Sequence, residues 1–320
     1  MKKNTAKFVE SLELEPPDPE EEALYSRRII SYSVNALKAA VGIDQIVINH
    51  PAFVRAITAM DRIFQLAREM EMPHGMVLLG PTGAGKTAAF KYFQSTLPSS
   101  SLFGPGDGAI GIRCPQRPRV GHFVASLLRT YRYPFAAGTA QQLYIRRGLV
   151  FDAIKEKGTR LIFVDEADSL IRWRSGIRDK YGDTEVTDFF REIVDECKVG
   201  LVFAGTTELD AIAMADKALA SRITAREVLS TFASDHNWVG IIKSLSRAYP
   251  AFDISALAEP ETAHLLHRAT AGNLRSLKRL IIEAVLIAFD NKKPTIDREI
   301  LGKAFNLVFG SASLQSNVFT

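Results

Sequence analysis

The sequence predicts an α/β protein in which a parallel sheet, covered by helices on both faces, is followed by a small helical domain. Three observations carry this prediction. Short apolar segments alternate with amphipathic ones between residues 76 and 204, a glycine-rich loop follows the first of them, and only helical patterns occur after residue 235. Strands that alternate with helices run parallel, because each crossover helix returns the chain to the same edge of the sheet.

The expected elements follow in chain order. From Arg27 to Met70 apolar residues recur at helical spacing with a break at His50-Pro51, which predicts two helical pieces before the sheet. Strands are expected at residues 76–79, 109–112, 161–164 and 199–204. Helices are expected between them at 88–94, 120–131, 139–156 and 187–196, and in the helical part at 238–247, 260–271, 274–291 and 297–309.

Length and composition set the domain organisation. With 320 residues and 47% hydrophobic content, the chain can bury a sizeable core and suggests two domains. We expect the α/β domain at residues 26–234 and the helical domain at 235–310. Residues 1–25 combine prolines with acidic residues and predict a disordered leader, and residues 311–320 predict a flexible tail.

Charge is unevenly distributed along the chain. Residues 1–25 hold three lysines against seven acidic residues, and because the whole chain carries +4, residues 26–320 carry +8. This basic excess favours a nucleic-acid partner, although a solvated basic surface explains it nearly as well. No segment is apolar enough to span a membrane or to form a signal peptide. Cys114 and Cys197 lack metal-ligand spacing and indicate core positions in a reducing, cytoplasmic setting.

The glycine-rich loop is the strongest local signal for a ligand. It matches the pattern G-x-x-x-x-G-K-[ST], in which successive backbone N–H groups and the start of the next helix face the phosphates of a nucleotide. Lys86 is expected to reach the terminal phosphates and Thr87 to hold Mg²⁺. A glycine-rich turn without a ligand is the alternative, which the apolar strand before the loop and the helix after it disfavour. The residues of the motif are Gly80, Pro81, Thr82, Gly83, Ala84, Gly85, Lys86 and Thr87.

Polar residues follow the third and fourth expected strands. Asp165 and Glu166 come directly after residues 161–164, where Asp165 would support the Mg²⁺ shell and Glu166 would orient an attacking water. An ordinary strand that ends in charged residues gives the same pattern, but the phosphate-binding loop upstream favours the functional interpretation. After residues 199–204, Thr206 and Thr207 can each supply a hydroxyl next to the terminal phosphate, and the sequence does not choose between them.

Two arginines complete the candidate site. Arg222 follows the fourth strand and the next helix, and we expect it to enter a neighbouring subunit's site and stabilise charge on the transferred phosphoryl group, with Arg226 as a rival. Arg275 lies in the first turn of a helix of the small domain, from which it can reach the terminal phosphate and couple nucleotide state to domain closure. A surface ion pair for Arg222 and a solvated face for Arg275 are the alternatives.

These motifs resemble those of a known family. The order GPTGAGKT, LIFVDEAD, LVFAGTT, ALASR and GNLR resembles an AAA+ ATPase, and VDEADSL followed by VFAGTTELDAI is similar to the TniB/TnsC transposition ATPases, relatives of MuB. The resemblance covers about residues 27–290 and implies an AAA+ domain with a helical lid. It assigns the ATP machinery to Lys86, Thr87, Asp165, Glu166, Thr206, Arg222 and Arg275.

The resemblance also implies an oligomer, a ring or a helical filament, that tracks the backbone of double-stranded DNA without sequence preference. Two basic clusters qualify as contacts. One contains Arg113, Arg117 and Arg119; the other contains Arg172, Arg174, Arg178 and Lys180, in an insert that departs from the family pattern. For each cluster a solvated face is an equally good interpretation.

The function implied is an ATP-dependent regulator that assembles on duplex DNA and delivers it to a transposase together with a target-selection protein, with ATP and Mg²⁺ as cofactors. A helicase loader or replication initiator is the main alternative. A helix-turn-helix after residue 235 would favour an initiator, and none is evident in the sequence. A membrane-associated secretion ATPase is a third interpretation, but the sequence shows no transmembrane segment that would favour it. A small-molecule kinase would need neither Arg222 nor a helical lid.

Overall fold

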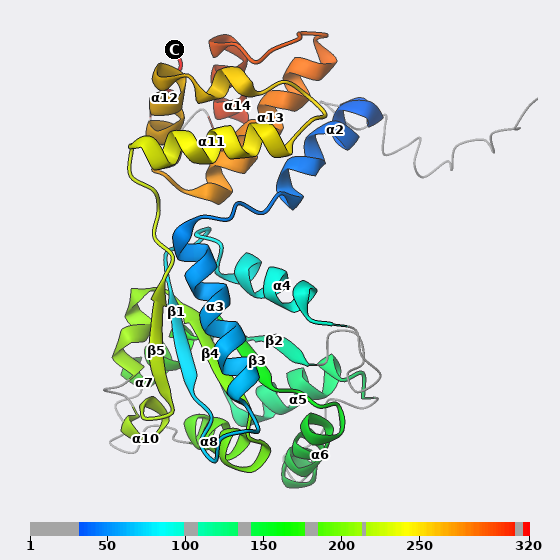
Figure 1. The fold of residues 1–320 in the computed structure, drawn as a ribbon, viewed down its shortest axis with the longest axis vertical. Helices are drawn as coiled ribbons and strands as arrows, with labels where there is room; N and C mark the ends of the chain where they lie inside the picture. Colours follow the sequence, from blue (N-terminus) through cyan, green and yellow to red (C-terminus); the bar gives the residue numbers. More distant parts are fainter. Residues whose placement is uncertain (1–31, 99–107, 134–141, 177–184, 213–215, 311–315) are drawn as a thin grey trace, which may run out of the picture.

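The computed structural model describes residues 32–98, 108–133, 142–176, 185–212, 216–310 and 316–320. Its centre is a five-stranded parallel sheet with helices on both faces, and a unit of helices lies beyond one end of the strands (Figure 1). The expected fold class, a parallel sheet sandwiched by helices with a small helical unit, is confirmed. The leader, residues 1–25, lies outside the described residues.

The strands occupy the order β2-β3-β4-β1-β5 in the sheet. Their bounds are Gly75–Leu79 for β1, Ala109–Arg113 for β2, Leu161–Asp165 for β3, Gly200–Gly205 for β4 and Ile223–Val228 for β5. The first four lie within a residue or two of the expected strands. The fifth was missed: β5 lies at the edge of the sheet and only its first residue is fully buried, so its sequence has no apolar run.

The register of the strands brings their carboxyl ends to one edge of the sheet. Leu79 is paired with Gly205, and Arg113 is paired with Asp165. The loop after β1, the carboxylates after β3 and the threonines after β4 therefore start from the same edge, which is where parallel sheets bind ligands.

Helices cover the two faces of the sheet through separate cores. On one face, α3 (Pro51–Leu66) and α4 (Lys86–Thr96) pack through aromatic residues; Phe90 stacks on Phe163 of β3 with 4.4 Å between ring centroids. The other face carries α5 (Val120–Thr130), α6 (Leu143–Glu156) and α8 (Glu185–Cys197). Shorter elements at the rim are α7 (Asp168–Gly176), η2 (Thr207–Ala211) and α10 (Lys217–Ala220). Both cysteines are buried, and burial raises the pKa of the Cys114 thiol to about 12.

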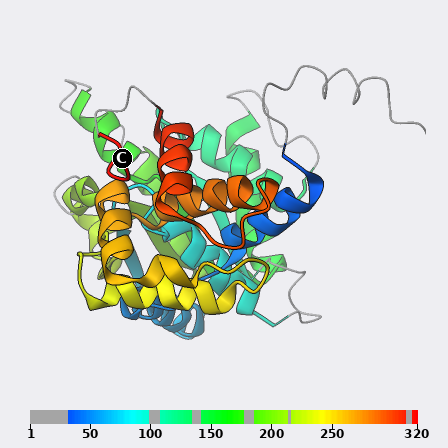
Figure 2. The same cartoon turned by 90° about the horizontal axis from the view of Figure 1, so that it is seen from above.

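The helical unit has a core of its own around the buried Trp238. Its elements are α11 (His236–Ala248), η3 (Ser255–Ala258), α12 (Pro260–Thr270), α13 (Leu274–Asp290) and α14 (Arg298–Phe309). Figure 2 shows this unit from above, with α2 (Val34–Gln45) beside it. Within the described ranges, no helix has the length and apolar character needed to cross a bilayer.

Two segments differ from the expected domain boundaries. The helix α2 (Val34–Gln45), expected in the α/β domain, packs on α13 because Ala36, Ala40 and Ile43 belong to the core of the helical unit. At the other end of the chain, residues 316–320 are packed: Phe319 is buried against Phe305, with ring centroids 6.2 Å apart. Residues 311–315 of the expected tail lie outside the described residues.

The start of α3 contains a titratable cap, which predicts a pH-dependent stability. The Nδ1 atom of His50 accepts a hydrogen bond from the backbone N–H of Phe53 at 3.3 Å. Burial, and then the nearby Arg55, lower the pKa of His50 in the folded chain. The unfolded chain therefore binds the proton first, so the free energy of unfolding should fall as pH drops below the ordinary histidine pKa of about 6.5. We expect the melting temperature to fall more between pH 7.5 and 5.5 in the wild type than in His50→Asn, which keeps a cap acceptor but cannot titrate. Equal falls in both proteins would contradict this role.

Candidate nucleotide-binding site

The loop between β1 and α4 is shaped to receive an anion. Gly83 and Gly85 have φ angles of 84° and 100°, which side-chain-bearing residues rarely adopt. A Cβ on Gly83 would lie 2.6 Å from Oδ1 of Asn273, whereas a Cβ on Gly85 would meet nothing within 4 Å. The backbone at Gly85 thus borders open space at the N-terminus of α4, where N–H groups and the helix dipole favour phosphate.

A cavity of about 330 Å³ opens above this loop. It brings together side chains from the loop, from the ends of β3 and β4, and from the first turn of α13. Among the expected site residues, its walls include Thr82, Gly83, Gly85, Lys86, Thr87, Asp165, Glu166, Thr206 and Arg275. Asp168 and Gln116 also line it, and neither was expected from the sequence.

A second cavity, of about 750 Å³, adjoins the first and shares Gly83, Thr87 and Arg275 with it. It runs between the helical unit and the α/β unit, and its walls mix apolar with basic side chains. They include Val41, Ile46, Ile48, His50, Phe53, Leu274, Lys278 and Ile282. An apolar cavity with a few polar groups beside a phosphate site suits the base and ribose of a nucleotide. The sequence does not predict this cavity, because its residues come from widely separated segments.

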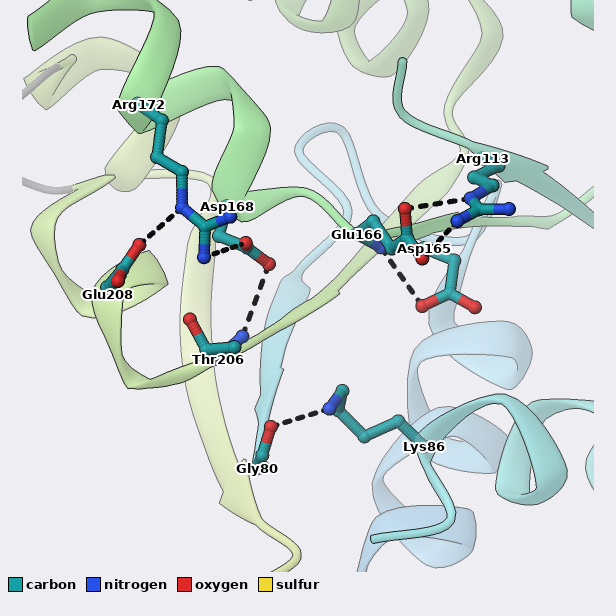
Figure 3. A network of polar contacts seen from close by, with 9 residues as sticks. All are labelled: Gly80, Lys86, Arg113, Asp165, Glu166, Asp168, Arg172, Thr206 and Glu208. Atoms are coloured by element: carbon teal, nitrogen blue, oxygen red, sulfur yellow. Dashed lines mark hydrogen bonds and ion pairs between the residues drawn. The ribbon is translucent and has the colours of Figure 1, made fainter. Parts of the chain in front are cut away.

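One hydroxyl and one carboxylate face each other at the mouth of the loop. Thr87 Oγ1 donates a hydrogen bond of 2.6 Å to Asp165 Oδ2. These hard oxygen donors fit Mg²⁺, which takes its remaining ligands from phosphate oxygens and water. The Lys86 ammonium lies across the loop and donates to the carbonyl oxygen of Gly80 at 2.5 Å (Figure 3). It also donates to the carbonyl oxygen of Pro81 at 3.0 Å. Burial lowers the pKa of Lys86, an effect that the neighbouring carboxylates oppose.

Glu166 is held away from the loop by an arginine. Arg113, the last residue of β2, donates from Nε to Glu166 Oε2 at 2.8 Å and from Nη2 to Oε1 at 2.5 Å (Figure 3). Glu166 itself adopts a left-handed backbone conformation, with φ of 55°. The strand register places Arg113 beside β3, where it pairs with this carboxylate; its expected contact with DNA stays a prediction.

The ion pair predicts a change in turnover. Arg113 occupies one acceptor site on each oxygen of Glu166 and fixes the direction of the carboxylate. We expect Glu166 to leave Arg113 when it orients the attacking water, so the pair should slow hydrolysis. We expect Arg113→Ala to raise the ATPase rate measured without DNA, by up to about fivefold for the loss of one exposed ion pair. Arg119→Ala, which removes a nearby exposed arginine outside the cavity, serves as the matched variant. A lower rate in Arg113→Ala would show that the arginine assists the reaction instead.

The structure distinguishes the two threonines after β4. Thr206 lines the cavity, and its Oγ1 is buried with no hydrogen-bond partner among the residues that the structure describes, whereas Thr207 is exposed and begins η2. The backbone N–H of Thr206 donates to Asp168 Oδ1 at 3.3 Å (Figure 3). Thr206 is therefore the threonine in position to meet a phosphate.

Arg172 belongs to the same network as Thr206. Its guanidinium contacts Asp168 Oδ2 at 2.9 Å and Glu208 Oε2 at 2.6 Å (Figure 3). Arg172 thus lines the cavity with its charge compensated by two carboxylates, and its expected contact with DNA stays a prediction. The side chains of Arg174, Arg178 and Lys180, the rest of that basic cluster, lie outside the described residues. Arg117 and Arg119 of the other cluster are exposed at the start of α5 and line neither cavity.

Arg222 lies away from both cavities. It immediately precedes β5, so it sits at the amino ends of the strands, and its backbone carbonyl accepts from Gly75 N at the start of β1. Its Nε and Nη2 donate to the two carboxylate oxygens of Asp195 at 2.9 and 2.8 Å. The rival Arg226 is more exposed and pairs with Asp210.

Arg275 and its neighbour Asn273 connect the helical unit to the loop. Arg275 is exposed in the first turn of α13 and lines both cavities. Asn273 Nδ2 donates to the carbonyl oxygen of Thr82 at 2.8 Å, while its Oδ1 caps α13 by accepting from Arg275 N at 3.1 Å. Sequence analysis assigned no role to Asn273, although it stands within the GNLR segment.

Comparisons with known proteins agree with this arrangement. A family model described as bacterial TniB protein matches residues 39–232. A curated relative named "AAA ATPase forming ring-shaped complexes", from Bifidobacterium longum subsp. infantis, is 31% identical over 156 residues, which cover 45% of this chain and 28% of the relative. The match therefore spans less than a third of that relative's length.

Solved structures share the fold at low identity. ORC2 of Aeropyrum pernix, in its ADP form, superimposes with a TM-score of 0.63 at 14% identity, over 87% of this chain and 75% of that one. ORC1 of Aeropyrum pernix in complex with DNA gives a TM-score of 0.60 at 18% identity, over 86% and 69% of the two chains. At such identities the likeness concerns the fold alone.

Proposed function

Because the chain belongs to the bacterial TniB protein family, whose model matches residues 39–232, we propose that it hydrolyses ATP between subunits assembled on duplex DNA. The observation that carries the proposal is the 330 Å³ cavity, where a phosphate-binding loop, a hydroxyl–carboxylate pair and a threonine hydroxyl meet. This hydroxyl has no hydrogen-bond partner within the described ranges. In the cell, the assembly presents its DNA to a transposase, with a target-selection protein as a further partner. Hydrolysis then acts as a timer for disassembly.

Each residue of the cavity has a distinct task in this proposal. Backbone N–H groups of residues 80–87 and the Lys86 ammonium bind the phosphates. Thr87 and Asp165 hold Mg²⁺, which, when bound, neutralises charge that builds up on the phosphate oxygens. Glu166, once free of Arg113, orients the attacking water, and the Thr206 hydroxyl donates to the terminal phosphate or to that water.

Two arginines complete the site in this proposal. Arg275 comes from the helical unit of the same chain, and Arg222 comes from a neighbouring subunit. Arg275 moves with the helical unit, and because Asn273 bonds Thr82 of the loop, contact between Arg275 and the terminal phosphate would couple nucleotide state to the position of that unit. Arg222 lies at the opposite end of the strands from the loop. It can therefore serve only a neighbouring subunit, where it leaves Asp195 and stabilises the transferred phosphoryl group.

Arg117 and Arg119, which are exposed before α5, are the proposed DNA contacts that a double variant can test together. Each true phosphate contact contributes about one unit to the slope of log K against log salt. We expect Arg117→Ala/Arg119→Ala to flatten this slope by about two units for random-sequence duplex. Lys243→Ala, on the exposed face of α11, should leave the slope unchanged. A slope equal to that of the wild type in the double variant would exclude this cluster.

Sedimentation tests the proposal as a whole. The full chain is centrifuged with a slowly hydrolysed ATP analogue, with and without random-sequence duplex DNA. Large assemblies that require both nucleotide and DNA support the proposal. A protein that stays small, and whose ATP turnover is indifferent to DNA, would contradict it and favour a motor that acts on a protein ring, such as a helicase loader.

A further inference from the structure

The Thr206 side chain carries an unused hydrogen-bonding group into the cavity. Its Oγ1 is buried, and within the described part of the chain it has no hydrogen-bond partner. Buried hydroxyls are nearly always partnered, so an orphan of this kind calls for an explanation. Thr206 shares the cavity with Lys86 and Thr87 of the loop, so a phosphate oxygen or the attacking water is the partner that the site implies.

Asp168 holds the backbone of Thr206. The carboxylate of Asp168 accepts from the backbone N–H of Thr206 at 3.3 Å, and the residue is only 6% exposed. The approach is close because residue 205 is glycine: a Cβ there would lie 2.6 Å from Asp168 Oδ1. The end of β4 and the start of α7 are thus fitted to each other at Gly205.

Asp168 is itself fixed from the far side by Arg172. Arg172 lies one turn later on α7 and contacts Asp168 Oδ2 at 2.9 Å, and its Nε donates to Glu208 at 2.6 Å. Glu208 stands two residues after Thr206, in η2. The contacts therefore form a closed circuit from Thr206 through Asp168 and Arg172 to Glu208, and back along the chain (Figure 3).

We propose that Asp168 and Arg172 are positioning residues of the ATPase site, which hold the Thr206 hydroxyl toward the terminal phosphate and the attacking water. The proposal rests on the ATPase function proposed above. The positive charge of the Arg172 guanidinium is already compensated by two carboxylates. Arg172 therefore acts through the backbone around Thr206 rather than as a phosphate ligand. Without the circuit, the hydroxyl is present but free to turn away from the reacting group.

The test compares Arg172→Ala, Thr206→Val and the double variant in steady-state ATP hydrolysis on duplex DNA. A small displacement of a catalytic group costs up to about 100-fold in rate, so we expect kcat to fall by about 10- to 100-fold in each single variant, with KM little changed. Because Arg172 works through Thr206, the double variant should be no slower than Thr206→Val. Arg172→Lys keeps one ion pair of the two, so its kcat should lie between that of Arg172→Ala and that of the wild type.

A binding measurement separates positioning from general damage to the site. The affinity for ADP alone should be unchanged in Arg172→Ala, while the affinity for ADP with aluminium fluoride, which imitates the transferred phosphoryl group, should fall in parallel with kcat. Lys303→Ala is the matched control, since it breaks an exposed ion pair to Glu299 at the same i,i+4 spacing on α14. This control should retain wild-type turnover.

Two outcomes would refute the positioning role. One is a wild-type kcat in Arg172→Ala while Thr206→Val is slow; the other is a double variant whose loss is the product of the two single losses. Failure of the underlying function looks different: the wild type would then hydrolyse ATP no faster than Lys86→Ala.

Discussion

A Glu166→Gln variant is expected to bind ATP like the wild type but to hydrolyse it about 10²- to 10⁴-fold more slowly. Glutamine keeps the size of the side chain, so the left-handed backbone at this position and the loop below it are preserved. The neutral amide, however, cannot accept a proton from the attacking water. Single-turnover hydrolysis measured beside equilibrium ATP binding separates the two effects.

The control for this variant is Glu299→Gln on α14, which removes an exposed carboxylate far from the cavity. Its turnover should match the wild type. Hydrolysis by Glu166→Gln within a few-fold of the wild-type rate would contradict the assignment of Glu166 as the residue that orients the attacking water. The candidate would then be Asp168, the other carboxylate of the cavity that is not expected to bind Mg²⁺.

The second large effect is expected from Arg222→Ala. Loss of an arginine that stabilises the transferred phosphoryl group lowers turnover by about 10³- to 10⁵-fold. ATP affinity should be retained, because Arg222 lies at the opposite end of the strands from the loop of its own chain and pairs there with Asp195. The measurements are ATP binding and turnover of the assembled protein on duplex DNA.

Arg226→Ala is the matched variant, because Arg226 also lies near the edge of the sheet and also pairs with an aspartate. We expect it to keep most of its turnover. The reverse result, a slow Arg226→Ala and an active Arg222→Ala, would assign the trans-acting role to Arg226.

Most of the fold could be predicted from the sequence because its strands are buried on both faces. Residues such as 161–164 and 199–204 read as continuous apolar runs, and the family membership inferred from the motifs is confirmed by the match over residues 39–232. The edge strand β5 gave no such signal, since only its first residue is fully buried. The packing of α2 on α13 was equally hidden, because periodicity shows that a helix has an apolar face but not which partner covers it.

The candidate site was predictable where its residues are contiguous and not where it depends on register. The loop residues and the Asp165-Glu166 pair lie in continuous motifs, and the cavity is lined by this pair and by most of the loop, though not by Gly80, Pro81 and Ala84. The choice of Thr206 over Thr207 needed the direction of each side chain at the end of β4. Arg113 and Arg172 appeared as members of basic runs, and only the strand order and the turn of α7 place them on carboxylates.

The central claim, an active site shared between neighbouring subunits on DNA, is tested most directly by mixing two inactive variants. Glu166→Gln supplies an intact Arg222, and Arg222→Ala supplies an intact Glu166. In a randomly mixed head-to-tail assembly on duplex DNA, about a quarter of the interfaces then combine both intact residues. We predict that an equimolar mixture regains about a quarter of wild-type ATP turnover. Turnover no higher than the mean of the two separate variants would contradict the shared site.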